Sequence, residues 1–315
     1  MSHEPATAIN VSGYRDNAAQ PPIHMRGVVK CFGPITAVDG LDFDVRPGTC
    51  VGLLGPNGAG KSTTMRLLTA QAIADAGEIE VLGYRIPQES KRARAECGVV
   101  PQLDNLDPDL SARQNLLVFA RLYRIPPPER DAAVQRALEL AHLHERGDAR
   151  VDQLSGGMRR RLLIARGLVH DPRLVLLDEP TVGLDPQVRH ELWTLIDDLR
   201  ARGVTVLMST HYIEEAERLA DTVSIMAGGR IVAEGPPGEL IEAHAGRHVL
   251  EVEGAAAELS ALERRLNAEG HRTHRTGPTL AVLHAESLDG EPPGSRRVAT
   301  LEDVFVALTG AAAED

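Results

Sequence analysis

The sequence predicts an α/β fold built around a parallel β-sheet, and three short apolar segments carry that prediction. These segments are residues 51–54, 174–177 and 204–208. Pro172 and Pro180 bound the second one, and unbroken apolar character is typical of strands that are buried on both faces of a parallel sheet. Helical patterns separate the three segments, and this alternation is the pattern of parallel strands joined by helices.

The N-terminal half adds the elements around this core. Residues 1–22 are polar and irregular, without the apolar run of a signal peptide, and we expect a flexible leader. Residues 23–51 read as short strands broken by turns at Gly33-Pro34, Asp39-Gly40 and Pro47-Gly48. A glycine-rich loop follows residue 54 and leads into a helix that we expect from about Ser62 to Gln71. Residues 103–148 look helical, with an interruption at residues 126–128.

The C-terminal part begins with a predicted hairpin at residues 222–235, whose two strands meet at Gly228-Gly229. From about Arg247 the composition shifts to strand-like pieces, residues 248–254 and 279–284, around a helical pattern. We therefore divide the chain into a main domain at residues 23–240 and a small α+β accessory domain at residues 241–315.

Composition excludes several classes of protein. The net charge of -11 argues against a nucleic-acid binder, which would gather Lys and Arg on one surface. The three cysteines, Cys31, Cys50 and Cys97, lack metal-ligand spacing and indicate a reduced cytosolic compartment. No stretch approaches the roughly 20 apolar residues of a membrane span, so we expect a soluble chain.

The strongest motif is "GPNGAGKS", which fits the phosphate-binding pattern G-x-x-x-x-G-K-[ST] between a strand and a helix. Backbone N–H groups of the glycines and the helix N-terminus favour phosphate. Lys61 would reach the β- and γ-phosphates, and the Ser62 hydroxyl would bind Mg²⁺. A glycine-rich turn without a ligand seldom ends in Lys-Ser. The predicted nucleotide-binding residues are Gly55, Pro56, Asn57, Gly58, Ala59, Gly60, Lys61, Ser62 and Thr63.

Acidic residues end the buried strand "LVLLDEP". Ligands of parallel sheets bind beyond the carboxyl ends of the strands, so Asp178 and Glu179 would lie near the phosphate loop. We expect Asp178 to hold Mg²⁺ and Glu179 to polarise the attacking water as general base. Without the phosphate loop, these two residues would be read as exposed acids at a strand end.

Two further polar residues follow predicted strands. His211 follows "VTVLMST" and would emerge at the same edge of the sheet, where it could contact the γ-phosphate. Gln102 lies between a strand and a helical segment, in "GVVPQLDN". A lone histidine or glutamine is more often structural, so both predictions depend on the neighbouring motifs.

A second phosphate cradle is predicted about a hundred residues further along the chain. In "LSGGM", Ser155, Gly156 and Gly157 leave backbone N–H groups uncovered where a helical pattern begins. The run Arg159-Arg160-Arg161 follows on that helix. A solvated helix face explains the run as well as a nucleotide role does.

Taken together and in this order, the motifs resemble the nucleotide-binding subunit of an ATP-binding cassette (ABC) transporter over residues 23–240. The resemblance implies a P-loop NTPase cassette with a parallel-sheet core, an antiparallel N-terminal β subdomain and a helical signature subdomain. It also implies that Phe32 stacks on adenine, that Gln102 binds Mg²⁺, and that Asp185 in "GLDP" belongs to the D-loop. Met158 departs from the Gln that usually ends the signature segment, residues 154–158.

The resemblance explains why one chain carries two phosphate cradles. In this family the signature of one subunit closes over the ATP that the phosphate loop of the other holds. The implied partners are a second copy of the chain, in a homodimer formed with ATP and Mg²⁺, and an integral-membrane permease, with no nucleic acid. The implied location is peripheral, on the cytoplasmic face of the inner membrane.

A finer resemblance is to ATP-binding subunits of nodulation-signal (lipo-chitooligosaccharide) and drug-resistance exporters. It is carried by residues 98–123, by "LSGGMRRRL" and by the ending "TLEDVFVALTG". An alternative is a soluble ABC ATPase of translation or DNA repair, but such proteins usually carry two cassettes or a long coiled coil. A cassette that binds without hydrolysing is opposed by the presence of Glu179 and His211.

Overall fold

A six-stranded sheet forms the centre of the molecule, in a computed structural model that describes residues 20–288 and 292–310. The strand order is β10-β9-β3-β8-β7-β6. The strands are β3 (Cys50–Leu54), β6 (Cys97–Val100), β7 (Leu174–Asp178), β8 (Thr205–Thr210), β9 (Thr222–Ala227) and β10 (Arg230–Gly235). All neighbours are parallel except β9 and β10, which form the predicted hairpin. The predicted parallel core is confirmed.

Both faces of this sheet are buried at its inner strands, which explains why those strands are apolar throughout, whereas the edge strand β10 is partly exposed. Leu174 and Leu176 of β7 pack into one core together with the N-terminal strands, whereas Val175 and Leu177 pack into a second core. Successive side chains of a strand point to opposite faces, so every residue of the strand needs to be apolar. The covering helices are α1 (Lys61–Leu68), α5 (Gly156–Leu168), α6 (Pro186–Ala201) and α7 (Ile213–Leu219).

An antiparallel sheet packs beside the central one, in the order β2-β1-β4-β5. Its strands are β1 (Ile23–Phe32), β2 (Ile35–Val45), β4 (Ala76–Val81) and β5 (Tyr84–Arg85), and α2 (Ser90–Glu96) follows them. The predicted turn at Gly33-Pro34 joins β1 to β2, but the predicted turn at Asp39-Gly40 is wrong. Gly40 has φ +65° inside β2, where the pairing with β1 is irregular, so this glycine serves a bulge.

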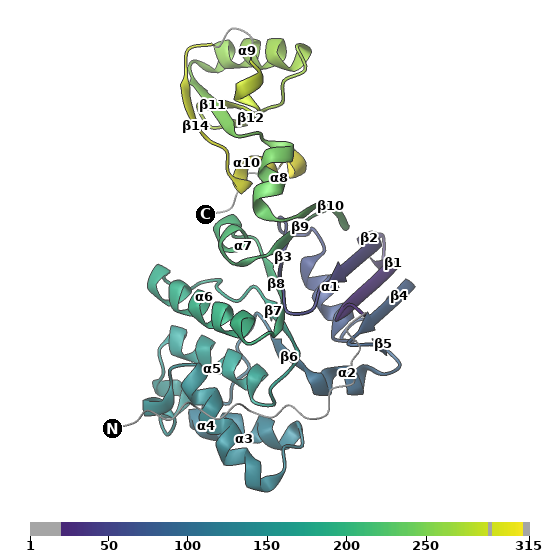
Figure 1. Ribbon diagram of the computed structural model, residues 1–315, viewed down its shortest axis with the longest axis vertical. Coiled ribbons are helices and arrows are strands. Elements are labelled where there is room, and N and C mark those ends of the chain that lie inside the picture. The colour runs from purple at the N-terminus through teal and green to yellow at the C-terminus, as the bar shows by residue number, and fades with distance from the viewer. Residues whose placement is uncertain (1–19, 289–291, 311–315) are drawn as a thin grey trace, which may run out of the picture.

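Helices α3 (Ala112–Leu122) and α4 (Arg130–Leu140) pack with α5 into a separate apolar core. Ser111 and Gln114 form a capping box that starts α3, and the predicted interruption at residues 126–128 separates α3 from α4. In Figure 1 these helices form one end of the long molecule, with the central sheet in the middle. The arrangement is the helical subdomain that the sequence predicts.

The C-terminal elements lie at the other end of the molecule in Figure 1. They are α8 (Pro237–His244), β11 (His248–Glu253), α9 (Ala256–Ala268), β12 (Thr273–Thr276), β13 (Thr279–Val282), β14 (Ser295–Val298) and α10 (Leu301–Thr309). The strands form an antiparallel sheet in the order β12-β13-β11-β14. The domain boundary after residue 240 stays a prediction, and it falls within α8. Most of the predicted leader lies outside the described residues.

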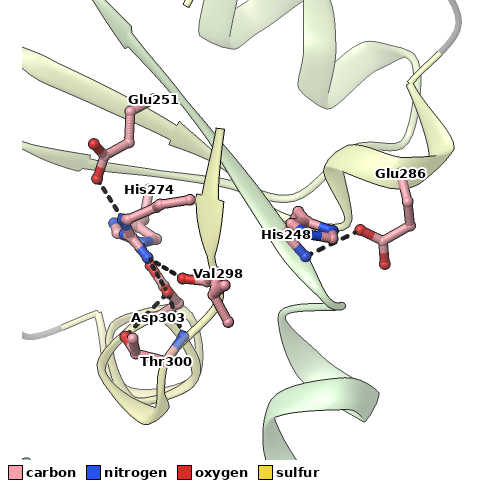
Figure 2. Close-up of polar contacts among 8 residues, drawn as sticks. His248, Glu251, His274, Glu286, Val298, Thr300 and Asp303 are labelled. Atoms are coloured by element: carbon pink, nitrogen blue, oxygen red, sulfur yellow. Dashed lines mark hydrogen bonds and ion pairs between the residues drawn. The ribbon is translucent and has the colours of Figure 1, made fainter. Parts of the chain in front are cut away.

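A buried carboxylate holds the C-terminal elements together (Figure 2). Asp303 of α10 is 1% exposed and accepts two hydrogen bonds of 2.7 Å from Arg297 at the end of β14. His274 Nε2 of β12 lies 3.1 Å from the same carboxylate, and the backbone N–H of Thr300 donates to it over 2.9 Å. Arg297 also donates to Glu251 of β11. Asp303 therefore connects α10 directly to β12 and β14, and Arg297 extends the connection to β11.

Within residues 20–288 and 292–310, none of the helices combines the length and apolar character that a membrane span requires.

Candidate functional site

The phosphate loop, residues 55–60, joins β3 to α1, and its glycines fit positions where other residues would not. Gly60 precedes α1 with φ +110°, and a Cβ there would lie 2.4 Å from the backbone oxygen of Ala37. A Cβ on Gly55 would lie 2.4 Å from the backbone oxygen of Met226. Gly58 has φ +82° and opens to space that no neighbouring atom fills within 4 Å. Gly55 and Gly60 are therefore required by close backbone contacts, and Gly58 and Gly60 by their positive φ.

Lys61 starts α1 and turns back across this loop. Its side chain is buried, and Nζ donates to the backbone oxygens of Gly55 at 2.5 Å and Pro56 at 3.1 Å. A cavity of about 250 Å³ lies over the loop. It is lined by Ile35, Ala37, Asn57, Gly58, Ala59, Gly60, Lys61, Ser62, Thr63 and Glu179. The lining brings together the predicted residues 57–63 and the predicted catalytic carboxylate, whereas Gly55 and Pro56 lie outside it.

Glu179 is the point where three predicted functional residues meet. Gln102, which follows β6, donates from Nε2 to Glu179 Oε2 over 2.9 Å. His211, which follows β8, has Nδ1 3.3 Å from Glu179 Oε1, and Lys61 Nζ lies 3.9 Å from the same oxygen. The carboxyl ends of neighbouring parallel strands supply these residues, as ligand-binding α/β sheets do. Three segments far apart in the sequence thus converge on one carboxylate.

The backbone at Glu179 is strained. Its φ is +46°, in the left-handed region that costs a non-glycine residue about 1–3 kcal/mol. Its N–H donates to Ser209, to the backbone oxygen at 3.1 Å and to Oγ at 3.2 Å. Neighbouring backbone and side-chain groups therefore hold the carboxylate in an orientation that an isolated loop would not adopt.

Asp178 lies at the end of β7, next to Glu179. Ser209 Oγ donates to its Oδ1 over 2.6 Å. Burial raises the pKa of Asp178, the hydrogen bond from Ser209 opposes that rise, and the charge of Glu179 adds to it. Ser209 was not predicted from the sequence. The only signal for it is a small hydroxyl residue near the end of an otherwise apolar strand.

The signature segment stands apart from this cavity. Ser155 caps α5, and its Oγ accepts from the N–H of Met158 at 3.2 Å. Met158 packs its side chain against the core of the helical subdomain. A Cβ on Gly157 would lie 2.6 Å from Val188 of α6, so this close approach of α5 and α6 requires glycine.

Two other predicted nucleotide-binding residues also lie outside the cavity lining. Asp185 caps α6, and its carboxylate accepts from the N–H of Val188 at 3.0 Å. Phe32, at the end of β1, is 47% exposed, and Lys30 Nζ lies 5.3 Å from the centre of its ring. Within one chain, the structure brings together the phosphate loop and the strand-end residues. It does not add Phe32, Asp185 or the signature segment to them.

The arginine run is not a uniformly solvated helix face. Arg159 has a side chain that is 40% exposed, whereas Arg160 is buried among backbone oxygens. Arg161 Nη1 lies 3.3 Å from Glu191 of α6. Of the two interpretations left open for the run, the solvated face therefore fails at Arg160 and Arg161, because both side chains lie against other segments of the chain.

The residues present fit a nucleotide with Mg²⁺. Ser62, Asp178 and Gln102 offer hydroxyl, carboxylate and amide oxygens, which suit a hard cation. Among the described residues, no group of three or more His, Cys, Asp or Glu side chains forms a metal cage. Mg²⁺ does not need one, because it usually binds through one or two carboxylates together with substrate phosphates.

Comparison with known proteins agrees with this site. The sequence profile of the ABC transporter family matches residues 38–182. The chain is 47% identical to the "Nod factor export ATP-binding protein I" of Burkholderia orbicola over 302 residues, covering 93% of this chain and 99% of the relative. The protein of the same name from Paraburkholderia xenovorans is 47% identical over 299 residues, covering 91% of this chain and 97% of the relative.

Comparison with solved structures points to the same family. The cbiO1 protein from Clostridium perfringens, part of an ABC transporter complex, has a TM-score of 0.66 at 25% identity, covering 80% of this chain and 98% of its own. A dimeric ATP-binding cassette in a post-hydrolysis state with ADP and Pi has a TM-score of 0.61 at 27% identity, covering 68% of this chain and 98% of its own. The names of these proteins refer to transport or to an ATP-binding cassette, and not to translation or DNA repair. The chain belongs to the ABC transporter family, and it is an ATP-binding subunit with ATPase activity that energises transport.

Proposed function

We propose that this chain hydrolyses Mg²⁺-bound ATP with Glu179 as the general base that polarises the attacking water. The observation that carries this proposal is the convergence of Gln102, His211 and Lys61 on the Glu179 carboxylate. Lys61 would hold the β- and γ-phosphates, and His211 would contact the γ-phosphate. Ser62, Asp178 and Gln102 would hold Mg²⁺, which neutralises phosphate charge when it is bound.

Two copies of the chain would share each nucleotide. The phosphate-loop cavity includes no signature residue of the same chain, and Ser155 and Gly156 are exposed. The start of α5 presents N–H groups and positive potential, which suit the γ-phosphate of a nucleotide held by another copy. Ser155, Gly156, Gly157 and Asp185 would then complete the partner's site, and Phe32 would stack on the adenine of the chain's own nucleotide.

The transport partner would be a separate integral-membrane permease, with this chain bound peripherally at the cytoplasmic face of the inner membrane. The names of the relatives at 47% identity, which refer to Nod factor export, support export of a lipo-chitooligosaccharide. We propose this class of amphipathic cargo for the complex of the chain with its permease.

Reconstitution tests this function. The chain and the membrane protein encoded beside it are placed in lipid vesicles, with the ATP-binding face outward, and a fluorescent lipo-chitooligosaccharide is added outside. We expect ATP to drive its accumulation inside, and chelation of Mg²⁺ to stop both accumulation and phosphate release. Phosphate release without accumulation would retain the ATPase and reject this cargo.

A further inference from the structure

Arg160 lies in the second turn of α5, and its guanidinium is buried among backbone carbonyl groups. In the described part of the chain, all five of its hydrogen bonds go to backbone oxygens. Nε donates to Pro180 at 2.6 Å, and Nη2 donates to Glu179 at 3.0 Å and Asp178 at 3.3 Å. Nη1 donates to Pro101 at 2.8 Å and to Gln102 at 3.1 Å.

These carbonyl groups belong to the two loops that carry the hydrolytic side chains. One loop follows β7 and holds Glu179, and the other follows β6 and holds Gln102. The planar guanidinium presents five N–H donors in a fixed arrangement, so it can bind both loops at once. It thereby fixes the strained backbone of Glu179 from the carbonyl side, while Ser209 fixes it from the N–H side.

Among residues 20–288 and 292–310, no carboxylate lies within ion-pair distance of Arg160, so its direct contacts are backbone oxygens. The Arg160 side chain is 9% exposed, and its guanidinium charge is satisfied by carbonyl dipoles. Burial lowers the pKa of Arg160, and the charge of Asp178 opposes that shift. Hydrogen bonds from a charged donor are roughly twice as strong as neutral ones, which offsets part of the cost of burial. A solubilising arginine would not need such a position.

The same helix begins at the signature segment. Ser155 caps α5, and Arg160 follows within the first two turns of one continuous helix. Helical hydrogen bonds make these turns rigid, so a displacement of Ser155 moves Arg160 and the carbonyl groups that it binds. The neighbours differ in this respect. Arg159 donates at 3.4 Å to the backbone oxygen of Leu154, in the signature segment itself, and lies 3.8 Å from Asp104. Arg161 faces Glu191 of α6.

We infer that Arg160 is a positioning residue that anchors the signature helix to the loops of Glu179 and Gln102 in the same chain. The inference rests on the proposed sharing of sites between two copies. Under that arrangement, the signature of a chain serves one nucleotide and its Glu179 serves the other. Arg160 then positions the loops that serve one nucleotide from the helix whose start serves the other.

The first experiment compares Arg160→Lys with the matched control Arg159→Lys. Lysine keeps the charge but has one donor centre, which cannot span both loops. We expect kcat to fall at least about tenfold while the ATP affinity of the monomer stays within about twofold, as for an interaction made only during turnover. The control should keep both values. Arg160→Gln is measured in parallel, because its amide keeps two N–H donors and buries no charge. We expect the same fall in kcat for this variant, since its amide cannot span both loops either.

Mixed dimers then decide where Arg160 acts. One chain carries Ser155→Arg and the other carries Lys61→Ala, so a single site combines Lys61 and Glu179 of the first chain with Ser155 of the second. We expect an Arg160 substitution to lower hydrolysis when it lies on the chain that supplies Glu179. On the chain that supplies Ser155 it should leave the rate within about twofold.

If hydrolysis falls only when the Arg160 substitution lies on the chain that supplies Ser155, then Arg160 only shapes the signature of its own chain. That result would overturn the inference. Equal loss in both placements, or no loss in either, would overturn it as well. Failure of the proposed function is distinguishable, because the unsubstituted chain would then release no phosphate from Mg²⁺-ATP.

Discussion

At the scale of single residues, chemistry concentrates on Glu179, a carboxylate in a strained backbone position. Its oxygens meet Gln102 and His211, and its N–H is held by Ser209. The strain fixes the direction of the carboxylate before any ligand binds. Preorganisation of this kind is typical of active-site residues in uncommon backbone regions.

Replacing Glu179 with glutamine tests this role. Glu179→Gln keeps the shape of the side chain and removes the base, so ATP should still bind. The hydrolysis rate should fall by roughly 10²–10⁴-fold, the usual contribution of general base catalysis. Trapped ATP should also shift the chain to a dimer in size-exclusion chromatography with Mg²⁺-ATP. Glu214→Gln, an exposed change on α7, serves as the control. Phosphate release at the parent rate would remove Glu179 from the mechanism.

Motifs in the sequence predict most of the site residues, because the phosphate loop and the strand-end acids are local patterns. Ser209 and Arg160 escape such patterns. Their roles depend on which backbone groups lie opposite them, and those groups belong to other segments of the chain. Sequence periodicity also cannot separate a buried arginine that meets carbonyl groups from one that faces water.

At the scale of elements, two buried ionisable groups connect helices and strands. His170, just after α5, stacks on Tyr123 at the end of α3, with ring centres 3.5 Å apart. Burial lowers the pKa of His170 to about 4, although a hydrogen bond to the backbone oxygen of Cys97 opposes the shift. The junction of α3, α5 and β6 is therefore built around a neutral imidazole.

This imidazole predicts a pH dependence of stability. The pKa of His170 in the folded chain lies below the value of about 6.5 for an unfolded histidine. As the pH falls below about 6.5, the unfolded chain takes up the proton first, so the free energy of unfolding decreases towards pH 4. When the free energy of unfolding is measured with urea at several pH values between 4 and about 6.5, His170→Gln should weaken its dependence on pH, whereas the exposed His144→Gln should not. An unchanged dependence of the free energy of unfolding on pH in His170→Gln would contradict a neutral buried His170.

Asp303 plays the corresponding part in the C-terminal elements. Burial alone would raise its pKa, but hydrogen bonds from Arg297 and His274 hold the pKa of Asp303 well below its usual value. Asp303→Asn removes this charge and leaves Arg297 with Glu251 as its remaining carboxylate partner. We expect the free energy of unfolding to fall by about 2–3 kcal/mol, since the arginine itself is partly exposed. ATP affinity should not change. The exposed Glu302→Gln is the control, and equal stability of the two variants would refute the role of Asp303.

Helices and strands are predicted correctly where a local sequence pattern determines them. The prediction fails where pairing with another strand determines the structure. Unbroken apolar runs predict β3, β7 and most of β8, and Gly228-Gly229 predicts the β9–β10 hairpin. Asp39-Gly40 carries a turn signal, yet pairing with β1 keeps it within a strand as a bulge. The β14 segment Ser-Arg-Arg-Val is mostly polar and mostly exposed, so no apolar pattern predicts it, and its position in the C-terminal sheet depends on pairing with β11.

At the scale of the whole molecule, we propose that each nucleotide site is shared between two chains. One chain carries the cavity of the phosphate loop and, outside its lining, an exposed signature segment. Ser155 would then serve the partner's nucleotide. Sharing would explain why a single chain contains two predicted phosphate cradles. It would require two chains to assemble, and no contact within one chain can replace that assembly.

The most direct test of this claim is Ser155→Arg, which places a bulky cation where the signature would meet the partner's γ-phosphate. The variant keeps its own phosphate loop, so calorimetry should show ATP binding to the monomer at parent affinity. ATP-driven dimer formation and hydrolysis should be lost, while Gln153→Arg, an exposed change two residues earlier, should keep both. Mixing Ser155→Arg with Lys61→Ala chains should restore part of the hydrolysis, because one mixed site is complete. Loss of nucleotide binding by the Ser155→Arg monomer would show that the signature acts within its own chain, and would contradict the shared site.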